Sequence, residues 1–142
     1  MYISGLSKAK EIAVKSTFQN THGKNIGVGA VIYKGKKIIA SSVNKNKTHP
    51  LMKYYNKEVP YKRIPYLHAE IAALLAARWE IGKNDLKNCT VYIARKLNCD
   101  GWGFARPCPA CMQALKDAGI KKIVYTTENG YAVEYINREE KI

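Results

Sequence analysis

The chain has 142 residues, 46% of them hydrophobic, which is the size of one domain that buries its own core. Lysine and arginine number 24 against 11 aspartates and glutamates, and the formal net charge of +13 favours phosphate-bearing partners, from nucleotides to nucleic acid. A/T-rich codons, which Lys, Asn, Ile and Tyr share, are a competing explanation of the lysine excess. No apolar stretch approaches membrane-spanning length and no secretory signal is visible, so we expect a single cytoplasmic domain over residues 1–142 with no membrane partner.

The first half of the chain predicts a helix, a hairpin and a loop. Apolar residues at helical spacing follow Ser7, a residue suited to helix capping, and predict a helix over residues 7–18. Two β-branched runs at 25–33 and 37–44, joined by a glycine-containing turn, predict a β-hairpin. Residues 45–66 have no sustained period and contain three prolines, so we expect a long functional loop there.

The second half alternates helices and strands. The strongest helix signal, rich in Ala and Leu, covers residues 67–81 and predicts a buried central helix. After it we expect a strand at 90–94, a second loop at 95–107, a helix at 108–118, and strands at 121–126 and 131–135 joined by an Asn-Gly turn. This order predicts an α/β protein, a three-layer α/β/α sandwich with a mixed five-stranded sheet.

Two cysteines stand one helical turn apart at the start of the predicted helix over 108–118. Cys108 and Cys111 are spaced closely enough to bind one metal ion, and Pro107 sets the entry into the helix. By itself, C-x-x-C also fits two ordinary core cysteines or a thioredoxin-like redox pair. The pair therefore indicates a metal only together with further ligands.

A histidine and a glutamate open the other strong helix. His68 adds an imidazole ligand and Glu70 a carboxylate, and the dipoles of two helix N-termini favour thiolate and hydroxide. Three protein ligands leave the fourth tetrahedral position of zinc open, as in catalytic sites. Cys89 or Cys99 as a fourth ligand would instead close the site and make it structural.

These residues carry a resemblance to a known family. H-x-E followed at a distance by P-C-x-x-C, here from His68 to Glu70 and from Pro107 to Cys111, resembles the signature of the cytidine deaminase-like zinc deaminases. The His-Ala-Glu form looks most like the deoxycytidylate deaminases. The resemblance implies Zn2+ held by His68, Cys108 and Cys111, with Glu70 as the catalytic proton carrier. It also implies a homo-oligomer, in which neighbouring loops complete a site.

Five further residues are candidates for contacts with substrate. The resemblance implies that the backbone N–H of Ala69 meets the base carbonyl and that Asn44 binds the sugar, although Asn44 also fits an ordinary turn residue. Tyr66 closes a basic, tyrosine-rich loop suited to phosphate and base contacts, or simply to packing on a solvated surface. Trp102 and Arg106 are placed to flank the pocket, with core packing as the competing account.

The first hypothesis for function is zinc-dependent hydrolytic deamination of cytosine in a free nucleotide, of the dCMP-to-dUMP type. The charge supports a polynucleotide deaminase acting on single-stranded DNA or tRNA as the second. A non-catalytic, zinc-stabilised nucleic-acid-binding domain closed by Cys99 is the third. The terminal hairpin, which makes the last two strands antiparallel, is more similar to the cytidine deaminases, although those commonly have cysteine in place of His68.

Overall fold

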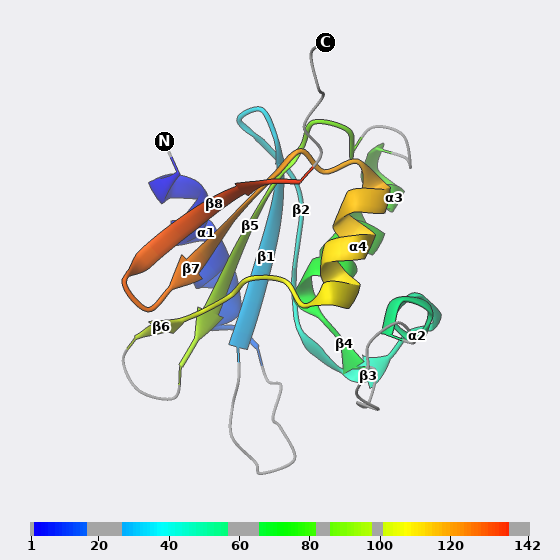
Figure 1. Cartoon of the computed structure of the whole chain (residues 1–142), viewed down its shortest axis with the longest axis horizontal. Coiled ribbons are helices and arrows are strands. Elements are labelled where there is room, and N and C mark those ends of the chain that lie inside the picture. Colours follow the sequence, from blue (N-terminus) through cyan, green and yellow to red (C-terminus); the bar gives the residue numbers. More distant parts are fainter. Residues whose placement is uncertain (1, 17–26, 57–65, 82–85, 98–100, 137–142) are drawn as a thin grey trace.

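The computed structural model describes residues 2–16, 27–56, 66–81, 86–97 and 101–136 of the chain. Its centre is a sheet with the strand order β2-β1-β5-β7-β8, and the short β6 pairs with β5 beside that path (Figure 1). The strands are β1 (Gly27–Lys34), β2 (Lys37–Val43), β5 (Thr90–Lys96), β6 (Trp102–Gly103), β7 (Lys122–Thr127) and β8 (Gly130–Tyr135). β5 and β7 are parallel and the other pairs are antiparallel, which confirms the predicted mixed sheet.

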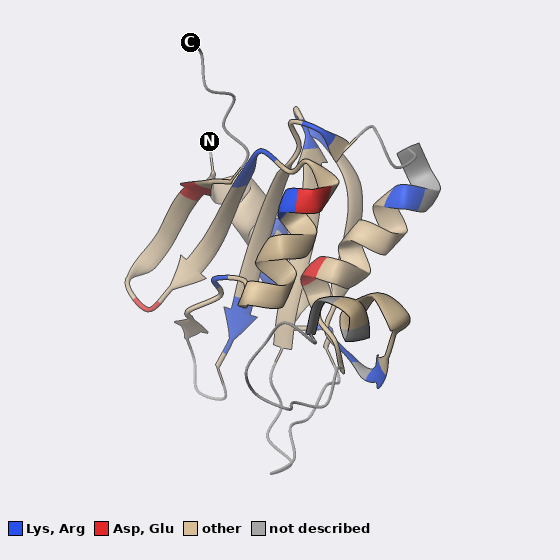
Figure 2. Ribbon diagram, turned by 45° about the vertical axis from the view of Figure 1, so that its right-hand side comes forward, with Lys and Arg blue, Asp and Glu red and all other residues tan. Residues whose placement is uncertain are grey.

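Helices cover both faces of this sheet and complete the predicted three layers (Figure 1). The helix α1 (Ile3–Ala13) lies on one face, against β1 and β5. On the other face α3 (Ala69–Ile81) lies against β1 and β2, with α4 (Pro109–Ala118) beside it. No helix in the described segments is long and apolar enough to cross a membrane. Basic residues are spread over several of these elements rather than gathered on one (Figure 2).

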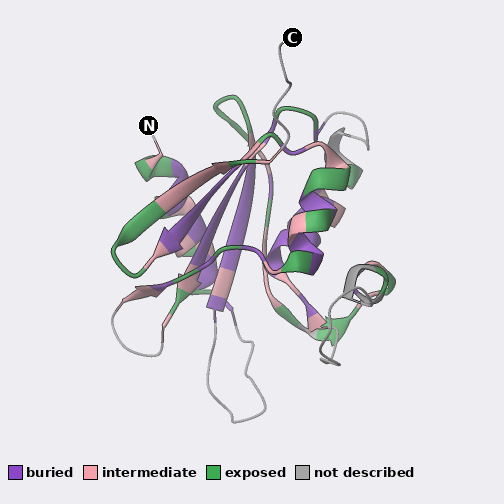
Figure 3. Cartoon of the chain, in the orientation of Figure 1, coloured by how far each residue is buried: buried purple, intermediate pink, exposed green. Residues whose placement is uncertain are grey.

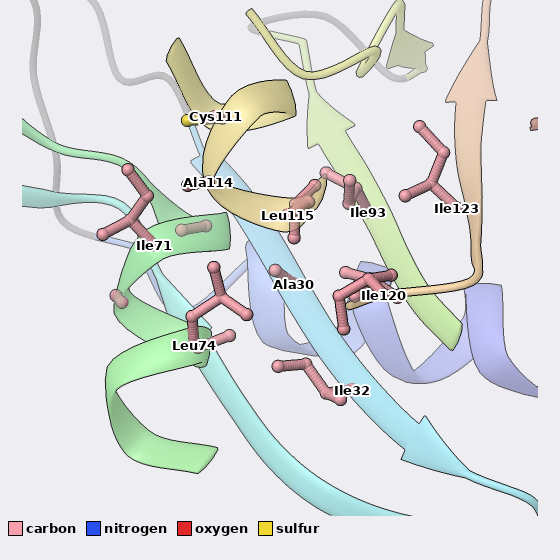
Figure 4. Packing of buried hydrophobic residues seen from close by; sticks show 14 of the residues in the cluster. Ala30, Ile32, Ile71, Leu74, Ile93, Cys111, Ala114, Leu115, Ile120 and Ile123 are labelled. Atoms are coloured by element: carbon pink, nitrogen blue, oxygen red, sulfur yellow. The ribbon is translucent and has the colours of Figure 1, made fainter. Parts of the chain in front are cut away.

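The larger hydrophobic core fills the space between the sheet and the helices α3 and α4 (Figure 3, Figure 4). Its fully buried side chains include Ile32 from β1, Ile93 from β5, Ile71 and Leu74 from α3, and Leu115 from α4. Burying one such side chain contributes about 1.5–3 kcal/mol. Because these residues pack on one another, the core fixes how the first turns of α3 and α4 meet.

The first helix begins earlier than predicted. It covers Ile3–Ala13 instead of residues 7–18, and Ser7 is an exposed residue within it rather than its cap. The reason is the stripe of Leu6, Ala9 and Ala13, which is buried against the sheet and extends the apolar face upstream. Residue 18 lies outside the described part of the chain.

A glycine allows α1 to approach the sheet closely. A Cβ added at Gly29 on β1 would meet the backbone of Ala9 and Ala13, with the Ala13 nitrogen 2.6 Å away. The helix therefore rests directly on the backbone of β1 at this point.

The prediction of a loop over residues 45–66 is wrong for its described parts. They form β3 (Lys45–Thr48), the helix α2 (Pro50–Asn56) and β4 (Tyr66–Leu67), while residues 57–65 lie outside the described segments. Pro50 stands at the first position of α2, where a helix needs no N–H from it. Nδ1 of His49 accepts the Leu51 N–H at 3.0 Å and satisfies another donor of that first turn. Pro50 therefore starts a helix and does not mark a loop.

The second predicted loop, over residues 95–107, is also partly wrong. β5 continues to Lys96, and Trp102–Gly103 forms β6, which pairs with Arg95 and Lys96. The Thr126 hydroxyl donates to the Gly103 carbonyl at 2.8 Å and accepts the Arg95 N–H at 3.1 Å. A side chain of β7 therefore links β5 and β6 where β7 itself no longer pairs with β5.

The end of α4 and the terminal hairpin are as predicted. Gly119 follows α4 with a φ of 89°, in the left-handed region that favours glycine at a helix end. β7 and β8 pair antiparallel, from Lys122 opposite Tyr135 to Thr127 opposite Gly130. The last described strand thus returns along the sheet edge without a helical crossover.

Candidate metal centre

The N-terminal ends of α3 and α4 carry the predicted metal ligands. His68 directly precedes α3, and its carbonyl accepts the Ala72 N–H at 3.0 Å in the first turn of that helix. Cys108 is the N-cap of α4, with its carbonyl accepting the Met112 N–H at 2.8 Å, and Pro109 follows where its missing N–H costs nothing. Cys111 is buried in the first turn of α4. The packing of α3 on α4 therefore brings three ligands from two motifs together.

The distances between the ligand atoms fit one zinc ion. Nδ1 of His68 lies 3.1 Å from Sγ of Cys111 and 3.6 Å from Sγ of Cys108. All three atoms lie within 4.8 Å of one another. Tetrahedral zinc, with Zn–N bonds of about 2.0 Å and Zn–S bonds of about 2.3 Å, holds nitrogen and sulfur roughly 3.5 Å apart. The three residues thus form a site that fits the predicted cofactor, Zn2+.

The pKa values of the two cysteine thiols shift in opposite directions. A hydrogen bond from Cys111, and then one with His68, lowers the pKa of Cys108 to about 4 despite its partial burial. The same hydrogen bond to Cys108, together with burial, raises the pKa of Cys111 well above the ordinary value. The hydrogen bond between the two thiol groups thus favours the thiolate at Cys108, and metal binding would release the proton of Cys111.

Glu70 is a buried carboxylate in the first turn of α3, with 6% of the residue exposed. Burial raises its pKa, while the charge of His68 and a hydrogen bond with Cys111 act in the opposite sense. Burying an ionisable group costs free energy unless it is paired, and groups buried in this way are found mainly at functional sites. Glu70 lies beside the metal ligands, where a carboxyl with a raised pKa is suited to both giving and taking protons.

The remaining cysteines do not join the group within the described segments. Cys89 is fully buried in the larger core, where its carbonyl accepts the Lys121 N–H at 3.0 Å. Cys99 lies outside the described residues. Among the residues that the structure describes, the metal group thus consists of His68, Cys108 and Cys111.

Two of the predicted substrate residues lie on chain segments adjoining His68. β3 pairs antiparallel with β4, with Lys45 opposite Leu67 and Thr48 opposite Tyr66. This ribbon places the segment that follows Asn44 beside the segment that leads into His68. Oδ1 of Asn44 accepts the Ser16 hydroxyl at 2.7 Å and the Val28 N–H at 3.1 Å, so the amide is held by the segment after α1 and by β1.

The other three predicted residues lie in different surroundings. Ala69 is buried at the first position of α3, where helix N–H groups have no acceptor within the helix. Trp102 packs against a second, smaller hydrophobic core, which lies between α1 and the sheet on the face opposite to α3 and α4. Arg106 is exposed and directly precedes the Pro107–Cys108 entry into α4. The structure thus places Trp102 apart from the metal group.

Sequence reasoning missed Glu134, the partner of Arg106. Arg106 donates from Nε and Nη2 to the two Glu134 carboxylate oxygens at 2.7 and 3.1 Å. The Tyr125 hydroxyl donates to the same carboxylate at 2.6 Å. One signal was present, since strand alternation places Glu134 on the same face of β8 as Ala132 and Ile136, which pack on the larger core. A lone carboxylate on such a face needs a partner.

Comparison with known proteins agrees with this geometry. Residues 4–127 match the family described as the cytidine and deoxycytidylate deaminase zinc-binding region. A stretch of 62 residues, 44% of the chain, is 37% identical to the tRNA(Ile)-lysidine synthase of Deinococcus deserti and spans 10% of that protein.

Two solved structures share the fold. Cytidine deaminase from Burkholderia pseudomallei superposes with a TM-score of 0.63 at 18% identity, covering 96% of this chain and 93% of that one. The apo dCMP deaminase from cyanophage S-TIM5 superposes with a TM-score of 0.56 at 19% identity, covering 88% of this chain and 81% of that one.

Proposed function

The chain belongs to the cytidine and deoxycytidylate deaminase family, and from this premise we propose that it hydrolyses the exocyclic amine of cytosine in a free nucleotide. The reaction is of the dCMP-to-dUMP type, in which water replaces the amine at C4 and ammonia leaves. We propose further that the reaction takes place in the cytoplasm and that the active enzyme is a homo-oligomer. Light scattering of the zinc-loaded protein tests that assembly.

The observation that carries the proposal is the burial of Glu70 against the group formed by His68, Cys108 and Cys111. A zinc ion in that group would supply Lewis acidity, which lowers the pKa of bound water to about 7. Glu70 takes a proton from the attacking water, passes one to the ring nitrogen, and delivers one to the departing amine. A buried site supports these transfers because bulk water does not compete for the carboxyl.

Contacts around the group support a base with a sugar attached. We assign the backbone N–H of Ala69 to the base carbonyl, since it stands beside His68 at the end of a helix. Asn44 takes the sugar, because Ser16 and Val28 hold its amide in one orientation. Tyr66, on the strand that leads into His68, lies near enough in the chain to contact the nucleotide.

Basic residues on the β3–β4 ribbon beside His68 favour a substrate that carries a phosphate. Lys45 and Lys47 are exposed on β3, and Lys45 lies opposite Leu67 in the register of β3 with β4. Arg106 precedes the other ligand segment, where two hydrogen bonds to Glu134 hold its guanidinium in place and offset its charge. Trp102 packs on the far face of the sheet, so we assign it no contact with the substrate.

The test is a panel of substrates incubated with the zinc-loaded protein, with uracil products and ammonia measured. Cytidine, dCMP, dCTP and a cytosine-containing single-stranded oligonucleotide form the panel. We expect dCMP to react with a higher kcat/KM than cytidine. Turnover of the oligonucleotide alone would contradict the choice of a free nucleotide, and turnover of none of the four would contradict the deamination of cytosine.

A charge variant sharpens the test of the phosphate. Lys45→Gln should lower kcat/KM for dCMP by roughly fivefold, about 1 kcal/mol, and leave cytidine unchanged. Lys36→Gln, in the exposed turn between β1 and β2, is the matched control and should change neither substrate. An equal loss for both substrates would mean that Lys45 acts on something other than the phosphate.

Deamination of a base in tRNA is the second candidate. It is supported by the 62-residue match to a protein named as a tRNA(Ile)-lysidine synthase and by the net charge of +13. Adding a tRNA anticodon stem-loop to the panel, with inosine and uridine as products, distinguishes the two. Exclusive turnover of the stem-loop would establish this candidate and displace the first.

A further inference from the structure

The sheet face that carries α1 has an aromatic and basic surface beyond the edge of that helix. Tyr131 and Tyr135 alternate with Val133 along one face of β8 and are 48% and 45% exposed. Val133 packs on the smaller core beneath α1, which assigns all three to that face. The exposed part of β8 lies at the sheet edge away from α3 and α4 (Figure 1, Figure 3).

A lysine lies among the aromatic rings of this surface. Nζ of Lys122 lies 4.8 Å from the ring centroid of Tyr2 and 5.7 Å from that of Tyr135, and it donates to the Tyr2 hydroxyl at 3.2 Å. The rings of Tyr2 and Tyr131 meet edge to face, with centroids 6.0 Å apart. Ammonium and rings thus hold one another in place, which reduces the entropy lost when a ligand binds. We call Tyr2, Lys122, Tyr131 and Tyr135 the tyrosine–lysine face.

A second pair of the same kind lies on this side of the sheet. Nζ of Lys10 on α1 lies 5.2 Å from the ring centroid of Trp102 on β6. Like Val133, Trp102 packs at the border of the smaller core. Positive charge and partly exposed rings therefore occur together at two places along one face.

We propose that the tyrosine–lysine face binds single-stranded nucleic acid, with bases stacked on the tyrosines and phosphates neutralised by the lysines. Aromatic residues on an open sheet face stack bases in this way, and stacking tolerates any base sequence. The net charge of +13 adds a general attraction for a polyanion. The bases of a duplex already stack on one another, so a single strand is the form that the rings can engage.

A second copy of the chain fits this face less well. In a two-fold symmetric interface the same patch meets itself, so Lys122 and its surroundings would face like charge. A strand brings the opposite charge. The face is also separate from the metal group, which lies among α3 and α4 on the other side of the sheet, so the proposal does not rest on deamination.

The test is fluorescence anisotropy of labelled 20-nucleotide oligothymidylate and oligouridylate with the zinc-loaded full chain. Neither probe has an exocyclic amine, so binding is read independently of deamination. We expect Tyr131→Ala and Tyr135→Ala each to weaken binding on the order of tenfold. We expect Lys122→Gln to reduce the slope of log K against log salt by about 0.7. Comparing the two probes distinguishes DNA from RNA as the source of the strand.

Tyr54→Ala is the matched control, because Tyr54 is 57% exposed on α2, on the opposite side of the sheet. It should leave binding unchanged, and circular dichroism melts should show all variants folded. Wild-type binding in both Tyr131→Ala and Tyr135→Ala would overturn the proposal, and loss of binding in Tyr54→Ala instead would place the strand on the other side of the sheet. The proposal would also be overturned by light scattering showing that the two face variants dissociate an oligomer while oligonucleotide affinity stays the same.

Discussion

Glu134 on β8 binds Arg106 through two hydrogen bonds of 2.7 and 3.1 Å, and Arg106 leads through Pro107 into the metal ligand Cys108. The same carboxylate accepts the Tyr125 hydroxyl at 2.6 Å. The Ala105 N–H donates to the Thr126 carbonyl at 2.9 Å, which ties the segment before α4 to β7 as well. The terminal hairpin therefore holds the segment that leads into α4, which carries two of the three metal ligands.

Replacing Glu134 with Gln should make stability differ from wild type in a pH-dependent way. Arg106, and then the Tyr125 hydroxyl, lowers the pKa of Glu134. A carboxyl of this kind stabilises the fold above its unfolded pKa of about 4.3, and the contribution is lost as pH falls through the folded value. The side chains are 44% and 32% exposed, so we expect a loss of about 1 kcal/mol or less near neutral pH.

Urea denaturation of Glu134→Gln and wild type between pH 7 and pH 3 measures this difference, which should shrink towards acid. Glu11→Gln is the control, because Glu11 is exposed and its contact with Lys8 is 3.4 Å. It should stay within about 0.5 kcal/mol of wild type. A difference for Glu134→Gln that grows towards acid would contradict the sign of the pKa shift.

Glu70→Gln should separate metal binding from turnover. The amide keeps the size of the side chain and removes its ability to carry a proton, so we expect the kcat for the best substrate to fall by about 10²–10⁴-fold. Zinc content, measured by mass spectrometry after dialysis, should remain at the wild-type value. Glu128→Gln, in the exposed turn between β7 and β8, should leave both quantities unchanged. Wild-type kcat in Glu70→Gln would exclude the proton-carrying role.

Cys108→Ser should lose the metal. A serine hydroxyl does not replace the Cys108 thiolate, whose pKa is lowered. Losing a residue that only hydrogen-bonds to a metal ligand lowers metal affinity by about 10–100-fold, so losing a ligand itself should lower zinc affinity by more than about 100-fold. Cys89→Ala is the control, because Cys89 is buried in the larger core and lies outside the metal group. Titration with a chelating dye reports both affinities. Tight zinc binding in Cys108→Ser would show that the ligands are assigned wrongly.

Gly29→Ala should loosen α1 from the sheet. The added methyl would meet the backbone of Ala9 and Ala13, which cannot rotate away, and we expect a loss of about 1–3 kcal/mol in the free energy of unfolding. Gly101→Ala is the control, since its nearest neighbour is Cδ1 of Leu97 at 4.0 Å. Urea denaturation at one pH compares the two. Equal stability of both variants would show that α1 does not rest on β1 as described.

Local sequence was enough for the metal ligands and for most of the fold. Helical and strand periods, the Gly119 helix end and the Asn129-Gly130 turn each depend on neighbouring residues, so the layers and the terminal hairpin could be predicted. The two motifs around His68 and Cys108 were readable for the same reason. Each motif stands at the start of a helix, where residues two or three positions apart lie close together at the N-terminal end.

Contacts between distant segments set the rest. The β3–β4 ribbon exists because residues 45–48 pair with residues 66–67. Neither segment is long enough to show the alternation of apolar and polar residues that predicts a strand. The sequence predicts Trp102 beside the pocket, yet β6 turns it towards α1, because pairing with β5 decides which face a strand residue occupies. The pairing of Arg106 with Glu134 joins residues 28 positions apart, and its geometry arises only once β7 and β8 lie beside the segment before α4.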